Sequence, residues 1–333
     1  MPRSLMLVPA GRATGLFVVS LGLVKALNDK GVKAAVFKPF EVGQNCNKDC
    51  PKNYSLTYMQ ALKYLSSNQV PELIAAIVAN YERLLKDTQA DVIVVEGAVT
   101  QMFDQHAINA AIREALNADI CMASMGMCPR AMALVKVALG AFGQAAQERF
   151  IGGVLYNHDA PLDANNIKKI QLSGPKDPNA QFGCSMDEAK DVGHEEGGAS
   201  CSCTPFAMIP FESANYALRA SDVAKLLGAE LQGQGCARVS GISFCAKSAT
   251  SSEILVTSAL PDSTEANLVI LCNGTQGLAG KATINTTHSP LAVVEALLSL
   301  PVVLFVDDTE RAEQIAAFSA QLFDNSLLDF LSK

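Results

Sequence analysis

Short apolar runs alternate with amphipathic segments as far as residue 227. The runs are brief and rich in apolar side chains, as buried strands are; they lie at 4–8, 33–37, 91–96, 120–123, 151–157 and 206–209. Segments with apolar residues at helical spacing lie between them, at 16–27, 56–65, 71–86, 108–116, 132–147 and 216–227. Strands that alternate with helices form βαβ units. The pattern therefore predicts an α/β fold with a parallel sheet flanked by helices.

The pattern stops between residues 160 and 204. This segment is rich in Asp, Asn, Gly, Pro, Ser and Lys, and no apolar period is visible after Ile170. Such a composition buries too little apolar surface to offset the entropy of ordering. We therefore expect a long, mobile insertion at about 160–204.

A second, smaller α/β domain is predicted after the glycine-containing segment 233–235. Strands are expected at 239–244, 254–256, 268–272 and 302–306, and helices at 290–299 and 309–323. The predicted domains are therefore 1–232 and 236–333.

The net charge and the cysteines indicate which partners and which cellular location to expect. The formal net charge is −7, with no local cluster of Lys and Arg, so we expect neither nucleic acid nor an anionic membrane as a partner. No export signal is visible, and the apolar stretch 291–306 is broken by Glu295 and Pro301. The ten cysteines are then best interpreted as reduced thiols, and a cytoplasmic location is expected.

The segment 10–17 lies where a phosphate-binding loop would lie, after the first strand and at the start of a helix. A working loop needs a Lys for the phosphates and a Ser or Thr for Mg²⁺. Leu16 and Phe17 occupy those two positions, and Ala10 replaces the first glycine. The sequence therefore predicts a degenerate loop, used either for weak anion binding at the helix N-terminus or as an ordinary turn without a ligand.

Several segments carry a family resemblance, which covers residues 1–232 apart from the insertion. They are 8–40, 65–68, 77–81, 95–97, 152–157 and 219–222. Together they resemble the N-terminal region of long bacterial phosphate acetyltransferases, which is similar to dethiobiotin synthetase and to the P-loop domains of cobyrinic acid amidases. The resemblance implies a degenerate P-loop NTPase-like first domain.

The segments 239–247 and 254–259 resemble that family's second module, the DRTGG domain. The Asp-Arg-Thr-Gly-Gly motif itself is absent, and residues 271–275 stand where its turn is expected. The family's acyl-transfer domain lies further towards the C-terminus and is not found before Lys333. The resemblance thus implies a regulatory, oligomer-stabilising region without catalytic residues. The alternatives are a stand-alone ATP-dependent ligase like dethiobiotin synthetase, and a pure interaction scaffold.

The resemblance also suggests ligand-binding residues, each with an ordinary alternative. Lys38 matches a substrate-binding Lys of the dethiobiotin synthetase relatives, or is a solvated residue at a strand end. Glu96 stands where P-loop relatives keep an acidic residue near Mg²⁺, although Phe17 removes the hydroxyl ligand. Asn157 matches a base-recognising Asn, or forms a turn.

The loop itself supplies the remaining candidates, Gly11, Arg12 and Gly15, with Arg12 able to offset the missing Lys. No cofactor and no metal site are expected. A zinc site at Cys201 and Cys203 fits no common spacing. The expected partners are a small-metabolite effector and further copies of the chain, together with the catalytic domain of the full-length protein.

Overall fold

The computed structural model describes residues 2–10, 15–41, 54–100, 102–125, 135, 137–143, 148–157, 171–172, 205–272, 274, 277–300 and 302–333. By its contacts the chain divides into two compact units. Unit 1 comprises Met1–Pro161, Gly183–Phe211 and Val303–Lys333, and unit 2 comprises Leu162–Phe182 and Glu212–Val302. The candidate insertion 160–204 and its cysteines lie outside the described residues, except for residues 171–172.

Unit 1 is built on a six-stranded parallel sheet with the order β2-β5-β1-β6-β7-β9. The strands are β1 (Arg3–Pro9), β2 (Ala34–Phe37), β5 (Val92–Glu96), β6 (Asp119–Met125), β7 (Phe150–Tyr156) and β9 (Ala207–Ile209). Each overlaps a strand predicted from the sequence. The predicted α/β fold with a parallel sheet flanked by helices is confirmed.

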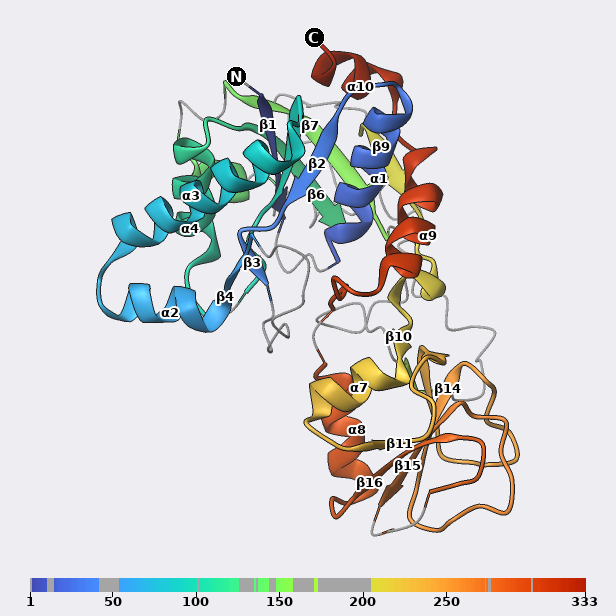
Figure 1. Ribbon diagram of the computed structural model, residues 1–333. Helices are drawn as coiled ribbons and strands as arrows, with labels where there is room; N and C mark the ends of the chain where they lie inside the picture. Colours follow the sequence, from blue (N-terminus) through green and yellow to red (C-terminus); the bar gives the residue numbers. More distant parts are fainter. Residues whose placement is uncertain are drawn as a thin grey trace, which may run out of the picture. The chain divides into compact units, whose positions relative to one another are not determined.

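Helices cover both faces of this sheet (Figure 1). α3 (Val70–Thr88) and α4 (Gln105–Ala115) lie on one face, with α2 (Tyr58–Ser66) beside α3. α1 (Phe17–Asp29) and α9 (Thr309–Ala320) lie on the other, followed by α10 (Asn325–Leu331). A short parallel pair, β3 (Phe40–Glu41) and β4 (Leu56–Thr57), precedes α2.

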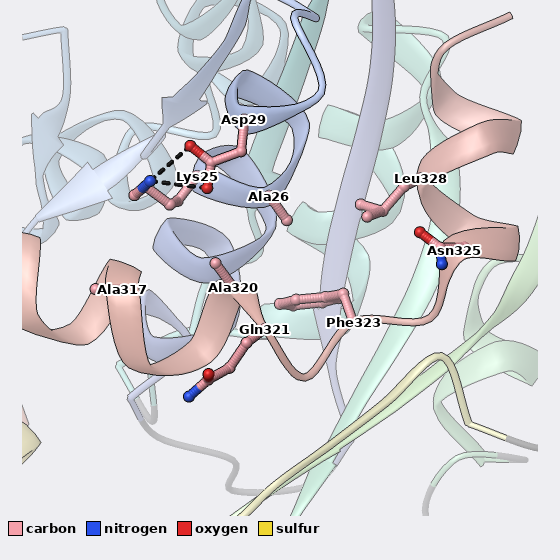
Figure 2. Close-up of a pocket in the computed structure, with 9 residues that line it drawn as sticks. All are labelled: Lys25, Ala26, Asp29, Ala317, Ala320, Gln321, Phe323, Asn325 and Leu328. Carbon is pink, nitrogen blue, oxygen red and sulfur yellow. Dashed lines mark hydrogen bonds and ion pairs between the residues drawn. The ribbon is translucent and has the colours of Figure 1, made fainter.

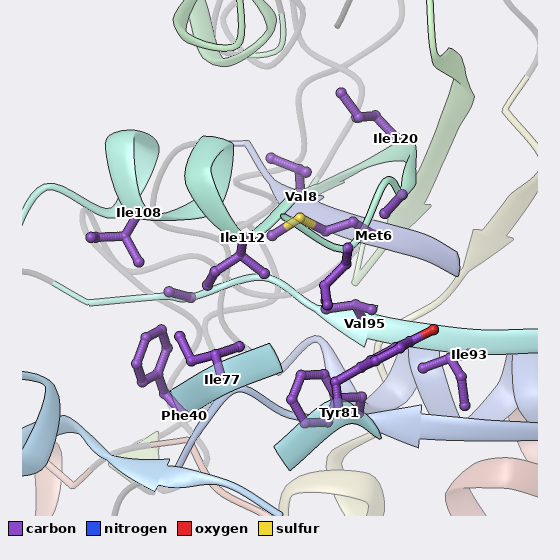
Figure 3. Packing of buried hydrophobic residues seen from close by; sticks show 14 of the residues in the cluster. Met6, Val8, Phe40, Ile77, Tyr81, Ile93, Val95, Ile108, Ile112 and Ile120 are labelled. Carbon is purple, nitrogen blue, oxygen red and sulfur yellow. The ribbon is translucent and has the colours of Figure 1, made fainter. Parts of the chain in front are cut away.

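Alternation along the strands creates two apolar layers in unit 1. Met6 and Val8 of β1 point to the α3 side, where Ile93 and Val95 of β5 join them in the core of Figure 3. Because successive strand residues face opposite sides, the buried Leu5 and Leu7 fall on the α1 side. α1 is apolar on nearly every side, which fits its position between the sheet and α9.

The helix starts on the α3 side are well capped. Thr57 and Gln60 form a capping box at α2, Asp104 accepts two backbone N–H groups at α4, and Pro71 lies in the first turn of α3. The N-cap residues of α1 and α3, Leu16 and Gln69, make no side-chain hydrogen bond at the helix start.

Unit 2 contains a second sheet of the order β11-β16-β15-β14-β13-β8, parallel except for β11. Its strands are β8 (Gln171–Leu172), β11 (Leu231–Gln232), β13 (Gly241–Ser243), β14 (Glu253–Thr257), β15 (Leu268–Cys272) and β16 (Ala282–Thr286). A separate antiparallel pair joins β10 (Leu218–Arg219) to β12 (Arg238–Val239). The helices are α7 (Ala220–Leu227) and α8 (Pro290–Leu298), with a 3-10 turn at Ser213–Tyr216.

Two features of the C-terminal third differ from the prediction. Residues 302–306 are not a strand: the described part of the unit 2 sheet is filled by other strands, and the Val303 carbonyl accepts a hydrogen bond from Arg311. The helix predicted at 309–323 does form, as α9, but it packs against α1 of unit 1 rather than joining the second unit. The compact units therefore have different bounds from the predicted domains 1–232 and 236–333.

No helix among the described residues is both long enough and apolar enough to cross a membrane.

Candidate functional site at the carboxyl edge of the first sheet

Two charged side chains meet where β2 and β5 end. Lys38 follows β2 directly and Glu96 is the last residue of β5, and the two strands are paired neighbours with Phe37 opposite Val95. The Lys38 Nζ lies 3.6 Å from the Glu96 Oε1, with the two side chains 30% and 13% exposed. Ligands of open parallel sheets bind at this edge, outside the carboxyl ends of the strands.

A hydroxyl from α1 completes this cluster. The buried Ser20 donates a hydrogen bond from Oγ to the same Oε1 of Glu96. The carboxylate thus has a cation and a hydroxyl donor on one oxygen. These contacts also tie α1 to the ends of β2 and β5.

Aromatic side chains border the cluster. The Lys38 Nζ lies 5.8 Å from the ring centroid of Phe17. The Tyr58 ring stacks on Phe40, with centroids 5.6 Å apart, and its hydroxyl donates to the carbonyl of Val99 at 3.3 Å. Burial raises the pKa of Tyr58 to about 12, and the negative charge of Glu96 adds to the rise. The Tyr58 hydroxyl therefore stays protonated at neutral pH.

Close packing and hydrogen bonds fix the backbone conformation directly after Glu96. A Cβ on Gly97 would lie 2.7 Å from the Leu7 carbonyl oxygen and 2.8 Å from the Pro9 Cδ, so only glycine fits against β1 here. The buried Asn109 side chain accepts from the Ala98 N–H at 2.7 Å and donates to its carbonyl at 3.1 Å. Glu96 is thus presented by a rigid turn.

The structure brings two of the predicted residues, Lys38 and Glu96, into contact. Gly15 lies just before α1 with φ of 79°, a left-handed conformation that glycine adopts readily. Asn157 follows β7 with φ of 50° and is buried. Because β1 and β6 separate β7 from β5, this end of β7 lies about 14 Å from Glu96 at ordinary strand spacing. Gly11 and Arg12 lie outside the described residues.

Leu16 and Phe17, which replace the Lys and the Ser/Thr of a working phosphate loop, are each only 4% exposed. They are core residues of unit 1, and neither offers a group for a phosphate or a metal. Among the residues that the structure describes, Ser20, Lys38, Glu96 and Tyr58 bring polar groups to this edge.

Sequence reasoning missed Ser20 and Tyr58. A signal existed for Ser20, because it is the lone polar residue in the apolar run 16–24 and falls at a buried position of α1. No comparable signal existed for Tyr58. Its approach to Glu96 depends on how the chain returns to α2 after β3.

Comparisons with known proteins relate the chain to acyl-transferring enzymes. It is 28% identical to the phosphate acetyltransferase of Salmonella typhimurium and 28% identical to that of Escherichia coli. Each match covers 100% of this chain and 53% of the relative. The phosphate acetyltransferase of Haemophilus influenzae is 26% identical, over 99% of this chain and 53% of its own length. No protein-family model matches the chain.

The extent of these matches is as informative as their identity. The chain spans about half the length of the curated relatives it matches. The alignments run over 389 to 392 positions although the chain has 333 residues, so the relatives carry additional residues within the matched region. Homology to phosphate acetyltransferases thus covers the whole of this chain but only part of each relative.

Proposed function

We propose that these 333 residues form a regulatory and oligomer-stabilising N-terminal region of a phosphate acetyltransferase and do not transfer acyl groups by themselves. The full enzyme would interconvert acetyl-CoA and phosphate with acetyl phosphate and CoA. The observation that carries the proposal is the extent of the match, which takes in the whole chain but about half of each relative. The other half of such a protein would hold the acyl-transfer site.

The geometry of the carboxyl edge supports binding rather than catalysis. Glu96 is already bonded to Ser20 and Lys38, and the Tyr58 pKa of about 12 makes that phenol a poor base at neutral pH. The buried Leu16 and Phe17 also weigh against a stand-alone ATP-dependent ligase, since that chemistry needs a Lys and a metal-bound hydroxyl at those positions.

An anionic metabolite is the effector that suits this edge. Lys38 would be its main contact, with Gly15, Asn157 and the predicted Gly11 and Arg12 as further members of the site. The metabolite must compete with Glu96 for the Lys38 ammonium. We therefore expect Glu96→Gln to strengthen binding of inorganic phosphate by about tenfold and Lys38→Met to weaken it by a similar factor. Phosphorus NMR line broadening would measure both effects.

Activity and assembly of the purified chain test the main proposal. Given acetyl-CoA and phosphate, the chain should release no CoA above background, as followed by chromatography, and sedimentation should show a stable oligomer. Turnover that disappears in Lys38→Met would make this edge an active site and refute the proposal. A monomer at all concentrations would remove its oligomer-stabilising part. An oligomer that binds no phosphate would favour the scaffold alternative.

A further inference from the structure

A hollow lies on unit 1 among α1, α9 and α10, on the face of the sheet that α1 and α9 cover (Figure 2). Its volume of about 410 Å³ falls within the range of small-molecule sites. The residues that line it are Lys25, Ala26, Asp29, Ala317, Ala320, Gln321, Phe323, Asn325 and Leu328. None of them belongs to the Lys38–Glu96 cluster.

The walls of this hollow are fixed by contacts outside it. α1 and α9 approach so closely that a Cβ on Gly22 would lie 2.3 Å from the Ser319 Cβ. The start of α10 is held by the Asp324 N–H, which donates to the Phe206 carbonyl at 2.7 Å. The hollow is therefore preformed, as small-molecule sites usually are.

Its floor is apolar and its rim is polar. Figure 2 shows three apolar side chains converging on the space: Ala26 of α1, Leu328 of α10, and Phe323, which lies between α9 and α10. Each of them is at least nine-tenths buried. At the rim, the Lys25 Nζ donates to both carboxylate oxygens of Asp29, at 2.6 and 2.8 Å. This division suits a ligand with a short apolar body and a charged head.

The rim carries one group of each charge. The side chains of Lys25 and Asp29 are 44% and 57% exposed, and such an exposed pair contributes little to stability, so a ligand can open it at small cost. The carboxamides of Gln321 and Asn325 add neutral donors and acceptors. A molecule with a single charge would satisfy one member of the pair and leave the other without its partner.

We propose that this hollow binds a small zwitterionic metabolite of the α-amino acid class. The ligand's ammonium lies on Asp29, its carboxylate on Lys25, and its apolar side chain on Phe323 and Leu328. The two charges replace the contacts that Lys25 and Asp29 make with each other, so no charge at the rim loses its partner. This site is separate from the anion site proposed at Lys38.

Saturation-transfer difference NMR with three matched probes tests the assignment. L-leucine carries both charges, 4-methylpentanoate lacks the ammonium, and isoamylamine lacks the carboxylate. L-leucine should bind the intact chain at low millimolar concentration, at least about tenfold more tightly than either truncated probe. Equal binding of a truncated probe, or no binding of L-leucine, would overturn the proposal.

Variants place the site on the structure. Asp29→Asn and Lys25→Gln should each weaken L-leucine binding by about tenfold or more, and Ala320→Phe should fill the hollow. Lys86→Gln, on the exposed end of α3, is the matched control, and Lys38→Met should also leave the affinity unchanged. Because Lys25 and Asp29 are partly exposed, their variants should fold even if Ala320→Phe does not. Undiminished binding in both variants would refute the site.

Discussion

At the scale of single residues, Glu96 takes its partners from two separate segments of the chain. Lys38 comes from the end of β2 and Ser20 from α1. The contact with Lys38 follows from the adjacency of two predicted strands. The contact with Ser20 depends on which face of α1 packs against the sheet. Because α1 is apolar on nearly every side, its hydrophobic pattern does not show which face that is.

Cys245 should be the most reactive of the four described cysteines. It is exposed after β13, and its pKa is lowered, first by a hydrogen bond from the Ser248 side chain and then by the backbone N–H groups of Lys247 and Ser248. Burial raises the pKa of Cys121 to about 12. Since the thiolate is the nucleophile, iodoacetamide near neutral pH should label Cys245 several-fold faster than the exposed Cys236, and Cys121 last. Peptide mass spectrometry would give the order.

Ser248→Ala is the control for this prediction, because it removes the largest cause of the lowered pKa. It should slow the labelling of Cys245 without changing that of Cys236. Equal rates for the two exposed thiols in the unaltered chain would contradict the prediction.

Tyr58 should make stability fall at alkaline pH. Its pKa is raised from 10.0 to about 12, so the folded state favours the protonated phenol. That contribution is fully present below about pH 10 and is lost as the pH rises towards 12. The free energy of unfolding should therefore decrease by up to about 2 kcal/mol across this window, as followed by urea unfolding.

Tyr58→Phe isolates this effect. The variant retains Tyr81, whose pKa burial also raises, so the difference between the two proteins reports on Tyr58 alone. If Tyr58→Phe lost stability above pH 10 as steeply as the unaltered chain, the Tyr58 phenol would ionise as easily in the folded state as in the unfolded state, and the prediction would be wrong.

At the scale of elements, the contact between α1 and α9 depends on a glycine. Gly22 lies in α1, and a Cβ there would lie 2.3 Å from the Ser319 Cβ and 3.0 Å from the Ser319 backbone carbon. Gly22→Ala should therefore destabilise unit 1 by about 1–3 kcal/mol, although alanine is the better helix former. Urea unfolding would measure the loss.

Gly140→Ala is the matched control for Gly22→Ala. Gly140 is also helical, but among the described residues no heavy atom outside its own helix backbone and chain neighbours lies within 4 Å of an added Cβ. The change should leave the protein equally stable or stabilise it by about 0.5 kcal/mol. If both variants behaved alike, the close approach of α1 and α9 would be refuted.

The elements of unit 1 were easier to predict than those of unit 2. The strands β1 and β5 are continuous apolar runs, a pattern typical of central parallel strands. β16 was missed because its sequence, ATINT, mixes polar and apolar residues, although its Thr and Ile residues have high β-propensity. The apolar composition of residues 302–306 predicts a strand. Composition alone does not show whether a neighbouring strand is available to pair with this segment, and in the structure the segment joins no sheet.

At the scale of the whole molecule, the order of segments in the chain differs from their order in space. Residues 303–333 end the chain, yet they belong to the same compact unit as β1 and α1. Ala207 of β9 forms an antiparallel bridge with Phe323, and Lys30 pairs with Asp329. α1 is apolar on nearly every side, and α9 covers the side that faces away from the sheet. The pattern could not identify α9 as that cover, because contacts between distant segments leave no periodic signal.

Ending the chain at residue 232, the predicted domain boundary, should therefore unfold the first unit, because residues 303–333 belong to it. A chain of residues 1–232, the predicted first domain, lacks α9 and α10 and would expose the side of α1 that faces them, around Gly22 and Ala26. We expect it to aggregate or to unfold at least about 10 °C below the intact chain, because several core side chains lose their packing at once.

A peptide of residues 303–333 added in trans should restore solubility with one-to-one stoichiometry, whereas the same peptide carrying Phe323→Asp should not, since Phe323 is buried. Circular dichroism and light scattering would follow both effects. A stable, soluble 1–232 chain that ignores the peptide would show that the predicted domain folds without α9.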